Sequence, residues 1–218
     1  YAAGSNQSSY TDGLIFGGSP QPSPKNETET WNGSSWTEVA NLNTARFSLA
    51  GGGTSSTSAI GFGGSPFSGK TEEWNGSSWT ETTDLSAGRN YLSGCGTASL
   101  GLAFAGEPGP GASPTTSTEE WTGAGANIGA WATGNSLNTG REEFNIGGAG
   151  TQTAALAFGG LTPPLTALTE KYNGTSWTEV GDLNTARYSL GGAGTQTAAL
   201  GFGGDSPPKA LTESFDGT

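Results

Sequence analysis

The chain repeats one pattern of residues along its whole length. The stretch from Asn173 to Gly204, NGTSWTEVGDLNTARYSLGGAGTQTAALGFGG, has a near copy that begins at Asn32, NGSSWTEVANLNTARFSLAGGGTSSTSAIGFGG. The triplet Phe-Gly-Gly, or its variant Phe-Ala-Gly, marks five copies at spacings of 46, 42, 54 and 44 residues, at 16–18, 62–64, 104–106, 158–160 and 202–204. A period of this size indicates a repeat protein, in which one small supersecondary unit is stacked several times.

Each copy is expected to form four short β-strands. In the second copy we predict strands at 47–54, 59–62, 70–74 and 79–82, the first two of which are short, rich in small residues and bounded by Gly and Ser. Asn75-Gly76 separates the last two strands and is the strongest short hairpin signal, since the turn requires positive φ. The third strand ends in a Thr-Glu-x-aromatic signal in all five copies, at Trp31, Trp74, Trp121, Tyr172 and Phe215.

Four features of the repeat together resemble the Kelch repeat of β-propellers. They are a Gly-Gly after an apolar strand, an aromatic residue on the third strand, a Trp that opens the fourth strand and an Arg before the next copy. The resemblance implies an all-β fold without helices, a five-bladed β-propeller with glycine-rich strands near the axis. It departs from the family in its five copies, where six or seven blades are more usual. We expect a single domain over 1–218 whose last blade lacks an outer strand, with blades at about 1–46, 47–89, 90–141, 142–187 and 188–218.

The composition argues against several classes of function. The net charge is −11 with eight basic residues, so a surface that binds nucleic acid is not expected. No apolar run approaches the roughly 20 residues of a membrane-spanning helix, so no membrane insertion is expected. The chain has no His and a single Cys, Cys95, which leaves neither the usual zinc or copper ligands nor a base for a Ser or Cys nucleophile. We therefore expect no cofactor and no enzymatic activity.

One basic and one acidic position recur in the repeat. Arg precedes the first strand of four copies, and Glu lies in the third strand of all five, at the same end of the blade. A ring of Arg for an anionic ligand is one interpretation. We favour a structural clamp, because a planar guanidinium suits fixed pairing with a carboxylate and Lys never replaces Arg here. The predicted clamp residues are Arg46, Arg89, Arg141, Arg187, Glu29, Glu72, Glu119, Glu170 and Glu213.

The loops between the second and third strands share prolines and no other sequence. Proline stiffens an exposed loop, and five unlike, stiff loops on one face of a rigid scaffold are typical of a recognition surface. The alternative is that the loop sequences vary simply because the loops are exposed. The residues that represent this candidate binding face are Gln21, Lys25, Phe67, Lys70, Glu107, Leu161 and Lys209.

The expected function is binding or assembly. The wording of the repeats (WNGSSWTEV, LNTAR, GTQTAALAFGG) resembles Kelch-type repeats of phage and marine environmental sequences. The resemblance implies a virion or extracellular component, such as a phage tail-fibre or capsid-surface module, whose partners are other protein subunits or a surface receptor or glycan. A secreted, lectin-like carbohydrate-binding propeller is the alternative.

Closure of the ring is the last expectation. The chain begins at a first strand and ends after a third strand, so its ends offer no shared four-stranded blade. Either blade five packs face to face on blade one through Phe215, or residues beyond this chain supply the missing strand. We favour the second alternative, in which the chain is a piece of a longer protein and the edge near Leu211 to Phe215 is an assembly contact or the point of continuation.

Overall fold

The computed structural model describes residues 2–5, 9–19, 23–123, 129–144, 148–205 and 210–218, and within them all regular structure is β. The strands form five antiparallel sheets in chain order, four of four strands and one of three. The first sheet contains β1 (Ala3–Gly4), β2 (Gly13–Phe16), β3 (Thr28–Trp31) and β4 (Trp36–Glu38). The second contains β5 (Ala50–Ser55), β6 (Ser58–Phe62), β7 (Thr71–Trp74) and β8 (Trp79–Glu81).

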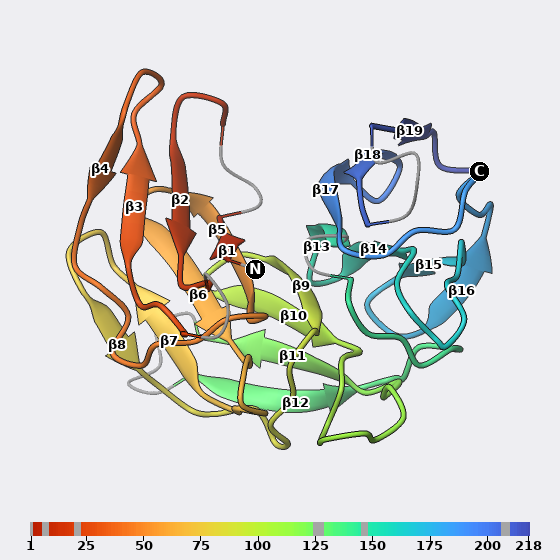
Figure 1. The fold of residues 1–218 in the computed structure, drawn as a ribbon, viewed down its shortest axis with the longest axis horizontal. Coiled ribbons are helices and arrows are strands. Elements are labelled where there is room, and N and C mark those ends of the chain that lie inside the picture. Colours follow the sequence, from red (N-terminus) through yellow and green to blue (C-terminus); the bar gives the residue numbers. More distant parts are fainter. Residues whose placement is uncertain (1, 6–8, 20–22, 124–128, 145–147, 206–209) are drawn as a thin grey trace.

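The other three sheets repeat this meander. The third contains β9 (Ser93–Gly96), β10 (Leu100–Phe104), β11 (Thr118–Thr122) and β12 (Ala130–Gly134). The fourth contains β13 (Gly148–Thr151), β14 (Ala154–Phe158), β15 (Thr169–Tyr172) and β16 (Trp177–Val180). Among the described residues, the fifth contains β17 (Leu190–Thr195), β18 (Ala198–Gly203) and β19 (Thr212–Phe215). The sheets are arranged as blades around an axis, each with its first strand innermost (Figure 1).

Small residues allow the inner strands to converge. A Cβ added at Gly52 of β5 would lie 2.9 Å from the carbonyl oxygen of Gly96 on β9, and one added at Gly94 would lie 2.4 Å from the Phe62 ring. These distances are shorter than real Cβ contacts, so the backbones approach as closely as glycine permits.

Backbone hydrogen bonds connect the turns that lead from one blade to the next. The amides of Tyr91, Glu143 and Ser189 each donate to the corresponding carbonyl of the preceding turn, at 3.1, 3.1 and 2.7 Å. Ser48 supplies the first of these carbonyls, and all four residues have φ between 50° and 55°. The second blade was expected to begin a strand at residue 47. Its first strand begins at Ala50, because residues 47–49 form this turn instead.

In the first four blades, a phenylalanine of the second strand packs against the glycine-rich part of the next blade. A Cβ added at Gly61 would lie 2.7 Å from the Phe16 ring, and one added at Gly201 would lie 3.0 Å from the Phe158 ring. Phe16, Phe62, Phe104 and Phe158 are all buried. The hydrophobic core is therefore a series of layers between neighbouring blades.

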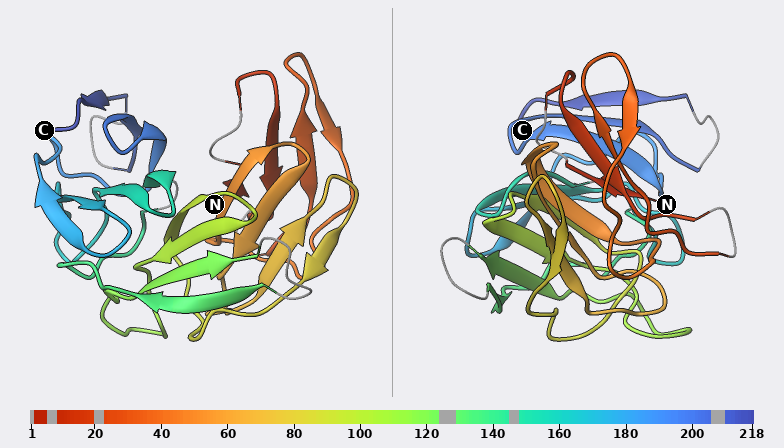
Figure 2. Two further views of the ribbon diagram at one scale, coloured as in Figure 1. Left: turned by 180° about the vertical axis from the view of Figure 1, so that it is seen from behind. Right: turned by 90° about the vertical axis from the view of Figure 1, so that its left-hand side faces the viewer.

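The five blades form an open arc. The first and the fifth blade stand apart at the opening, and the opposite view shows the same arrangement (Figures 1 and 2). Phe202 on β18, equivalent to the four buried phenylalanines, is 44% exposed. The alternative in which blade five packs face to face on blade one is therefore not what the structure forms.

Candidate functional site

The Arg46 guanidinium is buried between the first two blades and joins their connecting turn to the second blade. Its Nη1 donates to the carbonyls of Gly63 and Lys70 at 2.8 and 2.7 Å. Its Nη2 donates to Glu72 Oε1 at 2.9 Å. The second carboxylate oxygen, Glu72 Oε2, accepts from the backbone N and Nδ2 of Asn43 at 2.7 and 2.9 Å. Because both charged groups are removed from water, these bonds replace their lost hydration.

The same clamp recurs in the next three blades. The Nη2···Oε1 distance is 2.8 Å in each of the pairs Arg89–Glu119, Arg141–Glu170 and Arg187–Glu213. Burial lowers the pKa of Arg46, Arg89 and Arg141 from its usual value, and the paired carboxylate opposes this shift. Since all four guanidinium groups are held inside the blades, the geometry fits the structural interpretation and leaves no ring of arginines facing a ligand.

The assignment of Glu29 to the clamp is corrected by the structure. Each arginine pairs with the glutamate of the blade that follows it, so the four arginines serve the last four blades. Glu29 lies in β3 of the first blade and is half-buried. It lines a hollow with Gly17 and Lys25, at the position equivalent to the Arg46 site of the second blade.

Sequence reasoning missed the asparagine that completes the clamp. Asn138 donates through N and Nδ2 to Glu170 Oε2 at 2.7 and 2.8 Å, and Asn184 donates likewise to Glu213 Oε2 at 2.6 and 2.7 Å. The signal was present, because Asn stands three residues before Arg in three of the four copies of the Leu-Asn-Thr-Ala-Arg pattern.

Tryptophans of the fourth strands join neighbouring blades. Trp79 Nε1 donates to Thr28 Oγ1 of the preceding blade at 3.0 Å, and its ring meets Phe16 edge-on with centroids 4.7 Å apart. The next two junctions repeat both contacts. Trp131 donates to Thr71 and meets Phe62, and Trp177 donates to Thr118 and meets Phe104.

These contacts have no counterpart at the two ends of the arc. On the outward face of blade five, Leu200 and Phe202 are 47% and 44% exposed, whereas their equivalents in the other blades are buried. On the outward face of blade one, Ile15 and Trp36 are 39% and 47% exposed. Both ends therefore present apolar side chains of the kind that the inner junctions bury.

The loops of the candidate binding face lie against the turns between blades. Arg46 N donates to Lys25 O at 3.0 Å, and Arg89 N donates to Ser68 O at 3.1 Å. The exposed Lys25 ammonium pairs with Glu27 at 3.0 Å. Gln21 and Lys209 lie outside the described residues.

The remaining residues of this face are held by local contacts. The Lys70 ammonium pairs with Glu81 at 2.9 Å, and half-buried Phe67 has a φ of 51°. Glu107 Oε1 accepts from the Gly111 amide at 3.1 Å. Leu161 forms an isolated antiparallel β-bridge with Glu142. The structure thus brings these residues to one face without gathering them into one pocket.

Acidic side chains gather on this face beside the turns of the last three blades. Partial burial raises the pKa of Glu142 to about 7, and the negative charges of Glu107 and Glu143 add smaller increases. Partial burial and Asp205 raise the pKa of Glu143. Glu142 therefore lies in a region of concentrated negative charge and takes up a proton near neutral pH.

Cys95 is fully buried on β9, and its Sγ donates to Thr151 O at 3.5 Å. Burial raises the pKa of this thiol to about 12, so the reactive thiolate is scarce at neutral pH. Among the described residues, no group of three or more His, Cys, Asp or Glu side chains could hold a metal ion. The described part of the chain also contains no helix able to cross a membrane.

Five blade-like sheets with their first strands around one axis define the class of the chain: it is an all-β, five-bladed β-propeller. A solved structure, "Structure of YjhT", is similar to it with a TM-score of 0.71 and 12% sequence identity. The match covers 98% of this chain and 79% of that one, and at this identity it shows a shared fold. No known family model matches the sequence, and no curated protein is similar to it in sequence.

Proposed function

We propose that the chain is a non-enzymatic, Kelch-type binding propeller that assembles with other protein subunits, as a surface or tail-fibre component of a phage or other virion. The buried clamps support a structural role for its strongest ion pairs, because the arginines and their glutamates bind one another. The resemblance of the repeat sequence to phage repeats supports a virion component, which would be extracellular. The acidic composition makes a protein or glycan surface a better partner than nucleic acid.

The exposed apolar side chains at the two ends of the arc carry this proposal. Leu200 and Phe202 leave one blade face open, and Ile15 and Trp36 leave another open. The equivalents of Leu200 and Phe202 in the other blades are buried. Contiguous exposed apolar surface on a folded protein marks a protein interaction site, because burial of that surface is favourable.

Sedimentation analysis over a range of concentrations tests the proposal. We expect the chain to self-associate, and the double variant Leu200→Ser, Phe202→Ser to remain monomeric. Leu100→Ser is the matched control, because Leu100 is 46% exposed on an inner blade and should not affect association. A wild-type chain that stays monomeric at all concentrations and associates with no isolated virion protein would contradict the proposal.

Carbohydrate binding is the second candidate, favoured by the aromatic residues at the first blade. The Trp31 and Trp36 rings lie 5.3 Å apart, Trp31 Nε1 donates to Tyr10 O, and Tyr10 is 92% exposed. Exposed aromatic faces are suited to contact with sugar rings. Glycan-array binding that is lost in Trp36→Ala, with association unchanged, would support the lectin over the assembly component.

A further inference from the structure

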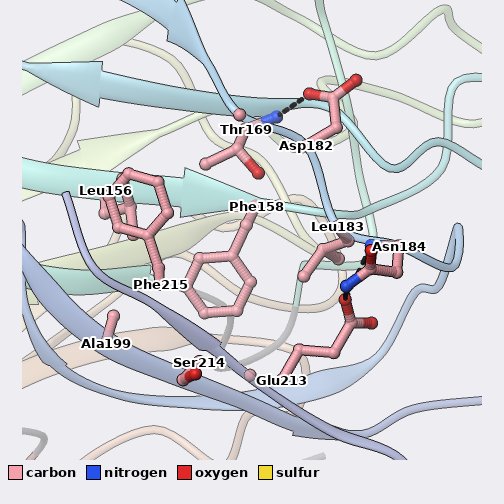
Figure 3. A pocket seen from close by; sticks show the side chains of 12 residues that line it. Leu156, Phe158, Thr169, Asp182, Leu183, Asn184, Ala199, Glu213, Ser214 and Phe215 are labelled. Atoms are coloured by element: carbon pink, nitrogen blue, oxygen red, sulfur yellow. Dashed lines mark hydrogen bonds between the residues drawn. The ribbon is translucent and has the colours of Figure 1, made fainter. Parts of the chain in front are cut away.

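A pocket opens between the fourth and fifth blades at the outer edge of β19 (Figure 3). Its walls include Phe158 and Thr169 from blade four, Phe215 from blade five and Asn184 from the turn between the blades. β19 pairs with β18 on one side, and among the described strands none pairs with its other side. The pocket therefore adjoins a strand edge with backbone groups available for pairing.

The equivalent space at the first junction contains a tryptophan. There the Trp79 indole contacts Phe16 edge-on, lies 5.5 Å from Trp74 and donates to Thr28 Oγ1 at 3.0 Å. The Trp79 carbonyl accepts from Asn43 Nδ2 at 3.1 Å.

The third junction shows the same four contacts. Trp177 lies 5.1 Å from Phe104 and 5.0 Å from Tyr172, donates to Thr118 Oγ1 at 3.0 Å and accepts from Asn138 Nδ2 at 3.3 Å. In repeat order, the counterparts of these four partners at the last junction are Phe158, Phe215, Thr169 and Asn184. All four line the pocket.

The hydroxyl on the pocket wall is oriented as in an occupied junction. Thr169 is buried, and its Oγ1 donates to Ala167 O at 3.5 Å. Thr71 Oγ1 donates to Gly69 O at the same distance while it accepts the Trp131 indole N–H at 3.0 Å. Since a hydroxyl has one donor and two acceptor lone pairs, Thr169 can accept an indole N–H in the same way.

The clamp of blade five holds the amide on the opposite wall. Asn184 Nδ2 donates to Glu213 Oε2 at 2.7 Å (Figure 3). Glu213 Oε1 accepts from Arg187 Nη2 at 2.8 Å. The Asn184 amide retains a second N–H for a strand carbonyl. The site is therefore preorganised without a fourth strand, which lowers the entropic cost of binding one.

We propose that this pocket and the adjoining edge of β19 form a binding site for an extended peptide strand that carries a tryptophan. The strand pairs antiparallel with β19, as β8 pairs with β7, and places its indole opposite Phe215, as Trp79 lies opposite Trp74. Main-chain hydrogen bonds supply sequence-independent affinity, and the indole slot selects the strand. This inference deepens the proposed assembly function by naming a mode of partner recognition.

A synthetic peptide with the sequence of residues 173–184, NGTSWTEVGDLN, serves as the probe. Titration calorimetry with the full chain should show saturable binding with one site per chain. The peptide in which Ala replaces the Trp should bind at least about tenfold more weakly, because a buried aromatic anchor dominates such interfaces. Hydrogen exchange of β19 amides should slow on binding of the Trp peptide.

A variant of the pocket gives a second readout. Thr169→Val should bind the Trp peptide about fivefold more weakly, because the indole N–H loses its acceptor. Leu100→Ser should bind it as the wild type does. Both peptides are tested on the wild-type chain. If the Trp peptide does not bind, or binds with the same affinity as the Ala peptide, the inference is wrong. Because peptide binding is measured at concentrations of monomeric chain, it can fail or succeed independently of self-association.

Discussion

At the scale of single residues, the clamp shows why arginine recurs where lysine does not. Arg46 spans two carbonyls and a carboxylate within one plane, whereas an ammonium is compact and cannot reach all three. Burial of these arginines also has an energetic cost, because the Nε atom of each one is buried without a hydrogen-bond partner among the described residues. A buried clamp of this kind is most sensitive to loss of one partner.

Arg46→Lys should lower the free energy of unfolding by about 1–3 kcal/mol, because at least one charge-assisted bond to a buried group is lost. Lys70→Ala is the contrast within the same blade, since the Lys70–Glu81 pair is exposed and its loss should cost under about 1 kcal/mol. Urea unfolding of both variants makes the comparison. Equal losses in the two variants would contradict a special role for the buried clamp.

Glu142 should make stability depend on pH. Its folded pKa of about 7 exceeds its unfolded value, so the folded state binds the proton more tightly. The stabilisation of the folded state by protonated Glu142 is complete below about pH 4.5 and is lost as the pH rises to about 7. After allowance for solvent screening, the loss should be no more than about 1 kcal/mol. Glu142→Gln should remove this part of the pH dependence in unfolding experiments between pH 4.5 and 8, and an unchanged slope would argue against it.

At the scale of elements, glycine in the first strands sets how closely blades converge. A Cβ at Gly94 would meet the Phe62 ring at 2.4 Å and Leu102 O at 2.8 Å, and the latter is backbone. The inner strand can relieve this contact only by moving away from its neighbours. Gly94 is therefore confined both by Phe62 of the preceding blade and by Leu102 of its own blade.

Gly94→Ala should therefore destabilise the chain by about 1–3 kcal/mol through overpacking. Gly109→Ala is the matched control, because an added Cβ there meets no heavy atom within 4 Å, so stability should change little or rise slightly. Thermal unfolding followed by circular dichroism measures both. Equal midpoints for the two variants would show that the inner strands can separate without cost.

At the scale of the whole molecule, an open arc has unequal blades. The third blade has a neighbour on each side, whereas the fifth has a neighbour on one side and three strands instead of four. In repeat proteins each unit is stabilised mainly by its nearest neighbours. The ends of the arc should therefore open more readily than its middle.

Hydrogen exchange measured by mass spectrometry should show this gradient. Amides of β17–β19 should exchange before those of β9–β11, although both sets belong to the same repeat pattern. Uniform protection across all blades would instead indicate that the arc unfolds as one cooperative unit. Added Trp peptide should raise the protection of β19 selectively if the proposed strand site is correct.

The sequence by itself determined the period, the number of blades and the order of strands. These features are local, because the strands and the Gly-Gly doublet, or its Ala-Gly variant, recur in each copy with similar near neighbours. It also indicated that the repeated arginines pair with third-strand glutamates, since their positions within a repeat put them at one end of a blade.

Only the tertiary structure decided which blade each arginine serves and what the ends of the arc expose. Glu29 resembles the other third-strand glutamates, yet its arginine would have to come from a preceding turn. The Trp79–Thr28 bond joins residues of different copies, which no pattern within one copy contains. The curvature likewise depends on how Phe16 packs against Gly61 across a junction. Side-chain volumes between blades set that angle, and these contacts join residues that are far apart in the sequence.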